Sequence, residues 1–191
     1  MPTREEQKEA RRNEILMAAL DIFIKKGYAG TRITDIAEAV HMSTGLLFHY
    51  YESKEKLYET LVEIGVSGPQ TVMKEDSTDP ITFFYNAAHS ILLYTKENPF
   101  VAKIFVLMIQ AWNQGPVTER IEELLPQIIA IEGSAEIIKR GQEMGQMKDG
   151  DPLALSLLFW SAIQGVAQSI AMNPEYPIPE ADWVVDILRK V

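Results

Sequence analysis

The sequence predicts an all-α protein of about nine helices, made of an N-terminal three-helix helix-turn-helix part and a C-terminal helical part. Apolar residues recur three and four positions apart along most of the chain, which is typical of helices with one buried face. Proline or glycine stands at most breaks between these segments, where it starts or stops a helix. We find no stretch in which apolar and polar residues alternate, the pattern of a half-exposed strand.

Composition limits the class of protein further. The chain has 191 residues, of which 47% are hydrophobic and 24% charged, and this suits one compact core or two small ones. The absence of cysteine excludes disulfides, thiolate metal sites and a cysteine nucleophile. The polar N-terminus and the lack of a long uninterrupted apolar run predict a cytoplasmic protein without a membrane span.

Helical segments can be placed along the whole chain. Gly27 is expected to end the first, and Gly65, Gly68 and Pro69 to bend or end the fourth. Pro126 and Gly133 could kink the longest segment. Outside the helix-turn-helix, the expected helices cover residues 5–26, 54–73, 81–96, 99–112, 117–147, 151–172 and 181–190.

Residues 31–58 contain the most informative pattern. Thr34 is a candidate cap for a short helix, because its hydroxyl can accept a bond from an unpaired backbone N–H. Ile36 and Val40 then share one face. A turn at His41 precedes Ser43, a candidate cap for the next helix.

The helix expected at residues 44–50 is too short to be stable alone, so neighbours must hold it. Leu47 and Tyr51, four residues apart, are placed to be its buried anchors. The residues that then face away from this support are small, hydroxyl-bearing or aromatic: Thr44, Gly45, Leu46, His49 and Tyr50.

Such a helix fits the major groove of DNA, which admits one helix and exposes base edges to its first residues. Gly45 would allow close approach of the backbone, and hydroxyl groups can bind phosphate. A helical hairpin that merely completes a bundle would show the same pattern. The residues alone leave both interpretations open.

The same stretch resembles the DNA-binding signature of the TetR family of bacterial transcriptional regulators. The resemblance covers residues 15 to about 61. His41-Met42 replaces the usual Gly-Val, and Phe48 replaces a usual tyrosine. The matching residues are Ile36-Ala37 and then Ser43-x-Gly45-x-Leu47-Phe48-x-Tyr50-Tyr51-x-Ser53-Lys54-Glu55-x-Leu57.

The resemblance implies a DNA-binding domain at residues 1–53 and a regulatory, ligand-binding and dimerisation domain at 54–191. Thr44, Leu46 and His49 are the candidates for base edges. The residues carried over as phosphate contacts are Thr34, Ser43, Tyr50 and Lys54. Arg11 and Arg12 stand either on a solvated face or where the first helix crosses the DNA backbone.

The net charge of −9 does not exclude DNA as a partner, because the charge is unevenly distributed. Residues 1–56 carry nine basic and nine acidic side chains, whereas residues 57–191 carry nine and eighteen. We therefore expect weak non-specific affinity, steep salt dependence, and reliance on the two half-sites that a dimer contacts.

The segment 151–172 is apolar nearly all round, so it is either a central core helix or an interface helix. We favour a homodimer formed by this segment and by residues 180–190, and the resemblance implies the same pairing. A two-fold dimer would place two recognition helices about 34–36 Å apart on a pseudo-palindromic operator.

Aromatic residues recur in the middle helices, where they form either core or the lining of a ligand pocket. TetR-like proteins are ligand-released repressors, so the resemblance implies an effector, and an aromatic lining would suit a small, largely apolar one. The candidate lining residues are Phe84, Tyr85, His89, Phe105, Met108, Trp112, Trp160 and Gln164.

No cofactor, metal-ligand pair or nucleophile with its base is recognisable, so we expect no enzyme and no catalytic residue. The sequence thus predicts a ligand-responsive repressor of the TetR type. The alternative is a helical interaction module whose helix-turn-helix no longer binds DNA.

Overall fold

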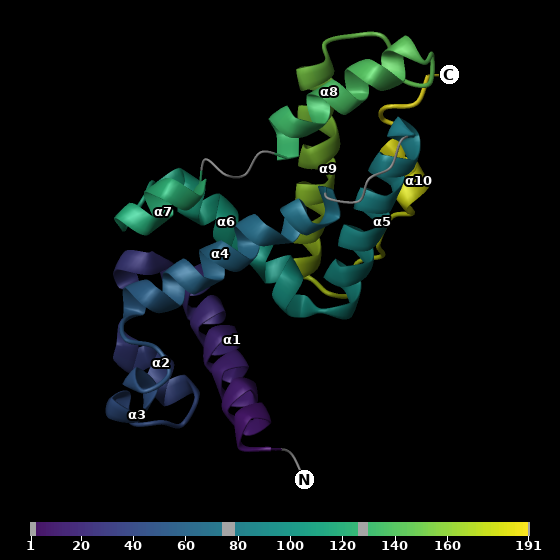
Figure 1. The fold of residues 1–191 in the computed structure, drawn as a ribbon. Coiled ribbons are helices and arrows are strands. Elements are labelled where there is room, and N and C mark those ends of the chain that lie inside the picture. Colours follow the sequence, from purple (N-terminus) through teal and green to yellow (C-terminus); the bar gives the residue numbers. More distant parts are fainter. Residues whose placement is uncertain (1–2, 74–78, 126–129, 191) are drawn as a thin grey trace.

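The computed structural model describes residues 3–73, 79–125 and 130–190 and contains ten helices within them. Figure 1 shows α1 to α3 at one end of the molecule and α8 to α10 at the other, with α4 and α6 between them. The helices are α1 (Arg4–Gly30), α2 (Ile33–Ala39), α3 (Thr44–Phe48), α4 (Lys54–Met73), α5 (Pro80–Glu97), α6 (Pro99–Gln114), α7 (Glu119–Leu124), α8 (Ala130–Glu143), α9 (Pro152–Met172) and α10 (Ala181–Val185).

Side-chain caps explain where many helices begin. The Thr3 hydroxyl accepts from the Glu6 N–H while the Glu6 carboxylate accepts from the Thr3 N–H, a reciprocal capping box. Asp79, Asn98 and Asp151 cap α5, α6 and α9, each just before a proline whose missing N–H is not needed there. The all-α prediction is confirmed in the part of the chain that the structure describes.

Several predicted boundaries were wrong. Thr34 does not cap α2, because the helix begins at Ile33, one residue before Thr34, and its N-cap is Arg32. The Arg32 N–H instead donates to the Asp35 carboxylate at 3.0 Å, so the backbone enters the helix before Thr34. The helix predicted at residues 44–50 ends at Phe48, and α10 ends at Val185.

Glycine and proline acted differently at the expected breaks. Gly27 interrupts α1 with a φ of 70°, as predicted, although the helix resumes and reaches Gly30. By contrast, α4 runs through Gly65 and Gly68 to Met73 without a break. The long segment predicted at 117–147 is divided into α7 and α8, and Pro126 lies outside the described residues.

Two buried clusters form the interior. The first joins α1 to α4 with α6 and α7, through side chains such as Phe23, Leu61 and Leu107. The second joins α5, α8, α9 and α10 around Phe84 and Phe159. The first cluster crosses the boundary predicted at residue 53, so the helix-turn-helix shares its core with α4, α6 and α7.

Helix α6 connects the two ends of the molecule. The Lys103 ammonium pairs with Asp21 of α1 at 2.5 Å, and the Gln110 side-chain amide donates to the Ile24 carbonyl at 3.0 Å. Against α4 the approach is so close that a Cβ on Gly65 would lie 2.3 Å from the Met108 sulfur. Displacement of α6 therefore acts on both α1 and α4.

Candidate DNA-binding surface

The short helix α3 is fixed at its start and on its inner side. The Ser43 hydroxyl accepts from the Leu46 N–H at 3.2 Å, which confirms Ser43 as the cap. Leu47 is fully buried and Tyr51 is 3% exposed. This anchoring accounts for a helix of five residues, which would not persist without its neighbours.

The outer side of α3 is exposed. Gly45, Leu46 and His49 are exposed, with 46% of the Leu46 surface accessible, whereas Thr44 and Tyr50 are half-buried. A Cβ on Gly45 would meet nothing within 4 Å, so packing within the chain does not require glycine there. The predicted base-reading residues Thr44, Leu46 and His49 thus lie on α3 and its C-cap residue, with Leu46 and His49 exposed.

The turn between α2 and α3 has an unusual backbone. His41 adopts a φ of 52°, in the left-handed region that non-glycine residues rarely occupy. The Met42 N–H donates to the Ala37 carbonyl at 2.9 Å, and the His41 N–H donates to Glu38. These bonds close the end of α2 and set the direction in which the chain enters α3.

Two arginines of α1 donate hydrogen bonds to the backbone at the ends of α2 and α3. Arg11 donates to the Val40 carbonyl at 2.8 Å, at the end of α2. Arg12 donates to the Tyr50 carbonyl at 3.1 Å and lies 4.6 Å from the centre of the Tyr51 ring. These guanidinium groups therefore position α2 and α3, a role that the sequence did not suggest for them.

Lys54 is also directed inward. Its ammonium donates to the carbonyls of Tyr28 and Thr31, each at 3.0 Å, and lies 4.1 Å from the centre of the Tyr28 ring. Next to it, the Tyr28 hydroxyl donates to the Glu55 carboxylate at 2.6 Å. That bond lowers the pKa of Glu55, while burial and the same bond raise the pKa of Tyr28. Together these contacts fasten the start of α4 to the end of α1.

The other predicted phosphate contacts are more accessible. Thr34 is exposed in the first turn of α2. Ser43 is exposed, and its hydroxyl can still donate while it accepts the capping bond. Tyr50 is half-buried against the first core. Of the four residues, Lys54 alone is engaged as an internal donor.

The sequence assigned no role to Phe48, which lacks the hydroxyl of the tyrosine that is usual at this position. The structure leaves 45% of Phe48 exposed, and it lines an open hollow together with Arg32 and Lys54. An accessible aromatic ring beside an exposed arginine adds to the surface around α3. Its exposure could have been expected from the sequence, because Phe48 directly follows the buried anchor Leu47.

The structure divides the eight predicted ligand residues between the second core and more accessible positions. Phe84 is fully buried and meets Phe159 edge-on, with ring centres 4.8 Å apart. Trp160 is 8% exposed and donates to Ser134, so both belong to the second core. The remaining six are exposed or half-buried on several helices: Tyr85, His89, Phe105, Met108, Trp112 and Gln164.

Helix α9 presents an apolar face that the other described residues leave exposed. Leu153, Leu157 and Leu158 are each about half exposed, and Met172 is 85% exposed. A Cβ on Gly165 would meet nothing within 4 Å. By length and composition α9 is also apolar enough to cross a membrane, a property that it shares with core helices of soluble proteins.

A braced helix with a capped N-terminus and an exposed outer side is the element that helix-turn-helix proteins insert into DNA. Fold and site therefore define a DNA-binding regulator. Residues 15–61 match the family model described as bacterial regulatory proteins of the tetR family. This match assigns the helix-turn-helix part of the chain to the TetR family of bacterial transcriptional regulators. The proteins that the chain resembles over most of its length are regulators rather than enzymes.

Known proteins resemble the chain well beyond the helix-turn-helix. The transcriptional regulator RutR of Escherichia coli K12 is 28% identical over 163 residues, 83% of this chain and 74% of RutR. The transcriptional repressor NicS of Pseudomonas putida KT2440 is 27% identical, over 76% of this chain and 70% of NicS. AibR, solved with isovaleryl coenzyme A and operator DNA, shares the fold, with a TM-score of 0.69, 16% identity, and 92% and 94% of the two chains covered.

Proposed function

We propose that this protein is a cytoplasmic repressor that binds a pseudo-palindromic operator as a homodimer and is released by a small, largely apolar ligand. The DNA-binding part of the proposal rests on α3. This helix is anchored by Leu47 and capped by Ser43, and its outer side is exposed. Two similar proteins support a repressor that responds to a ligand: NicS is named a repressor, and AibR was solved with isovaleryl coenzyme A and operator DNA.

Within the DNA complex, Thr44, Leu46 and His49 read base edges, with Leu46 against a thymine methyl group. Thr34, Ser43 and Tyr50 donate to phosphates. Lys54 is assigned to holding α4 against α1, because its ammonium already donates to two carbonyls. Glycine at position 45 allows the DNA backbone or a base to approach α3 closely.

The dimer forms through the uncovered face of α9, with α10 beside it. Leu157 belongs to this face and is 51% exposed, while Trp183 of α10 is 66% exposed. A second copy that covers these side chains removes apolar surface from water, which favours association. Val184 and Leu188, by contrast, are buried within the chain and hold α10 in place.

A charge on this face tests the dimer directly. Leu157→Glu is expected to give a monomer in sedimentation at micromolar concentration, because association would bury an unpaired carboxylate. Leu93→Glu, on an exposed position of α5 with 41% accessibility, is the matched control and should leave the dimer intact. A wild-type monomer at that concentration would contradict the proposal.

Ligand release requires two conformations that differ in the direction of α4. Helix α4 leaves the helix-turn-helix at Lys54 and meets α6 at Gly65, so a shift of α6 changes the separation of the two recognition helices. A ligand weakens operator binding only by its preference for the non-binding conformation, typically by about 1–3 kcal/mol.

Selection of bound sequences from a random DNA pool tests DNA recognition and finds the operator at once. We expect a two-fold symmetric sequence to be enriched. His49→Ala and Leu46→Ala should relax the preference at particular base pairs, whereas Leu93→Ala, an exposed leucine on α5, should change nothing.

Absence of any enriched sequence would favour the other interpretation, a helical interaction module without DNA-binding activity. The acidic net charge of −9 and the phenylalanine at position 48 are the features that favour this alternative.

A further inference from the structure

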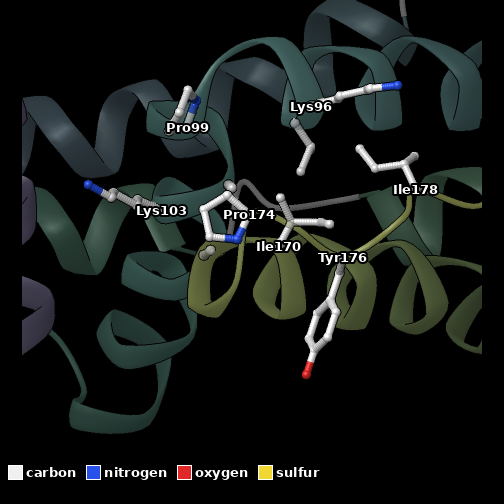
Figure 2. Close-up of a pocket in the computed structure, with 10 residues that line it drawn as sticks. Lys96, Pro99, Lys103, Ile170, Pro174, Tyr176 and Ile178 are labelled. Atoms are coloured by element: carbon white, nitrogen blue, oxygen red, sulfur yellow. The ribbon is translucent and has the colours of Figure 1, made fainter.

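Cationic side chains border two hollows in the described part of the chain, and their charges are placed differently. At the turn between α5 and α6, Lys96 and Lys103 line a pocket, but Figure 2 shows both side chains extending away from it. Beside α3, Arg32 and Lys54 line the open hollow that Phe48 also borders. The second hollow lies on the proposed DNA-binding surface, where an available cation can meet a phosphate.

Arg32 is the basic side chain of this surface that no described residue pairs with. Residues 31–56 hold three lysine and arginine side chains, which are Arg32, Lys54 and Lys56. The Lys54 ammonium donates to two backbone carbonyls, and the Lys56 ammonium pairs with Glu59 at 3.6 Å. Arg32 is exposed, and its guanidinium has no hydrogen-bond or ion-pair partner among the described residues. Its N–H donors are therefore available to a ligand.

The acidic residue nearest in sequence, Asp35, does not pair with this guanidinium. Lys26 pairs with the Asp35 carboxylate at 2.9 Å, and the carboxylate also accepts from the Arg32 backbone N–H. The Lys26 bond is the largest cause of the lowered pKa of Asp35, and the Arg32 charge is a smaller one. Arg32 thus stands at the N-cap of α2 with its backbone held and its side chain available.

Two acidic residues also border the hollow, and they differ in their contacts. The Glu55 carboxylate accepts from the Tyr28 hydroxyl at 2.6 Å. Glu52 is exposed. An anion in the hollow is attracted by Arg32 and repelled by Glu52, so removal of either charge has a predictable sign.

We propose that Arg32 binds one phosphate of the DNA backbone in each half-site. A guanidinium can bind phosphate with two parallel N–H bonds, which fixes the position of the DNA as well as adding affinity. Phe48 is 45% exposed in the same hollow, so its ring offers an apolar wall to the adjacent deoxyribose. Arg32 lies at the start of α2, outside the helix that is placed to reach base edges, so its contact carries no sequence preference. The assignment rests on the proposed function.

The salt dependence of operator binding by Arg32→Gln measures this contact. The logarithm of the affinity falls with the logarithm of the salt concentration by about 0.9 per neutralised phosphate. Loss of one contact in each half-site should therefore flatten the slope by roughly 1.8. Between about 50 and 200 mM salt, the wild type should lose roughly tenfold more affinity than Arg32→Gln.

Matched variants separate this contact from a general effect of charge. Arg32→Lys keeps the charge and should keep the slope. Lys139→Gln removes an exposed charge from α8, at the opposite end of the molecule (Figure 1), and should leave the slope unchanged. Glu52→Gln should strengthen binding to all sequences, because it removes the repulsion. Urea denaturation of Arg32→Gln should match the wild type, since the guanidinium makes no bond within the described protein.

Ethylation of operator phosphates, which removes their charge, locates the contact. One ethylated phosphate in each half-site should interfere with binding of the wild type and have no effect on Arg32→Gln. An unchanged salt slope in Arg32→Gln, with operator still bound, would overturn this assignment alone. A change in base preference in place of a uniform loss would overturn it as well, because Arg32 would then read a base. If the wild type binds no DNA, the proposed function fails and the assignment fails with it.

Discussion

Gly65 lies where α4 touches α6, and replacing it with alanine tests how closely the two helices are coupled. The new Cβ would lie 2.3 Å from the Met108 sulfur, 2.6 Å from Met108 Cγ and 3.2 Å from Ile104 Cγ2. Ordinary contacts begin at 3.4 Å, so the sulfur must move by at least 1.1 Å, the difference between 3.4 and 2.3 Å. Met108 is flexible enough to move, but Ile104 is stiff and anchored in the first core.

Two opposing effects determine the size of the change. Alanine in place of glycine inside a helix stabilises by about 1 kcal/mol. Overpacking of a filled contact destabilises by about 1–3 kcal/mol. Gly68→Ala on the same helix is the matched control, since a Cβ there meets nothing within 4 Å. We expect Gly68→Ala to stabilise the fold and Gly65→Ala to be about 1–3 kcal/mol less stable than that control.

Urea denaturation of both variants measures the difference, and Met108→Ala supplies the rescue. In the Met108→Ala background the penalty at Gly65 should largely disappear, because the side chain that occupied the space is gone. If Gly65→Ala stabilises as much as Gly68→Ala, the close contact between α4 and α6 does not exist in solution. If the penalty persists without Met108, its cause lies elsewhere.

Three further variants probe the support of α3 and α4. Ser43→Ala should cost about 1 kcal/mol in urea denaturation through loss of the cap, and Ser43→Asp should restore stability yet weaken operator binding, because a carboxylate would face phosphate. Arg12→Ala should lower stability by about 1 kcal/mol, since it removes the bond to the Tyr50 carbonyl. Weaker DNA binding with unchanged stability would instead make Arg12 a phosphate contact. Tyr28→Phe should raise the pKa of Glu55 towards its ordinary 4.5, because the hydroxyl is the largest cause of its lowered value. A lowered pKa contributes stability above about pH 4.5 that is lost as the pH falls through the folded-state pKa, so denaturation of Tyr28→Phe should depend less on acid pH. Identical acid profiles would show that the bond contributes nothing.

Features decided by neighbours in the sequence were predictable. The Ser43 cap, the buried pair Leu47 and Tyr51, and the α9 segment all follow from signals within a few residues of each other. A capping side chain accepts from a backbone N–H two or three residues later, and a buried face has apolar residues at regular spacing. These local rules were enough to locate the element that carries the proposed function.

Features decided by partners distant in the sequence were not predictable. Arg12 and Lys54 carry the charges that phosphates attract, yet their donors bind carbonyls 38 and 26 residues away. Phe84 and Trp160 have the composition of a pocket lining but pack into the core. The sequence by itself determined which helices form and which of their faces are apolar. Only the tertiary structure decided which hydrogen-bond donors found acceptors and which aromatic rings were buried inside the protein, because a side chain's partner depends on where the other helices pack.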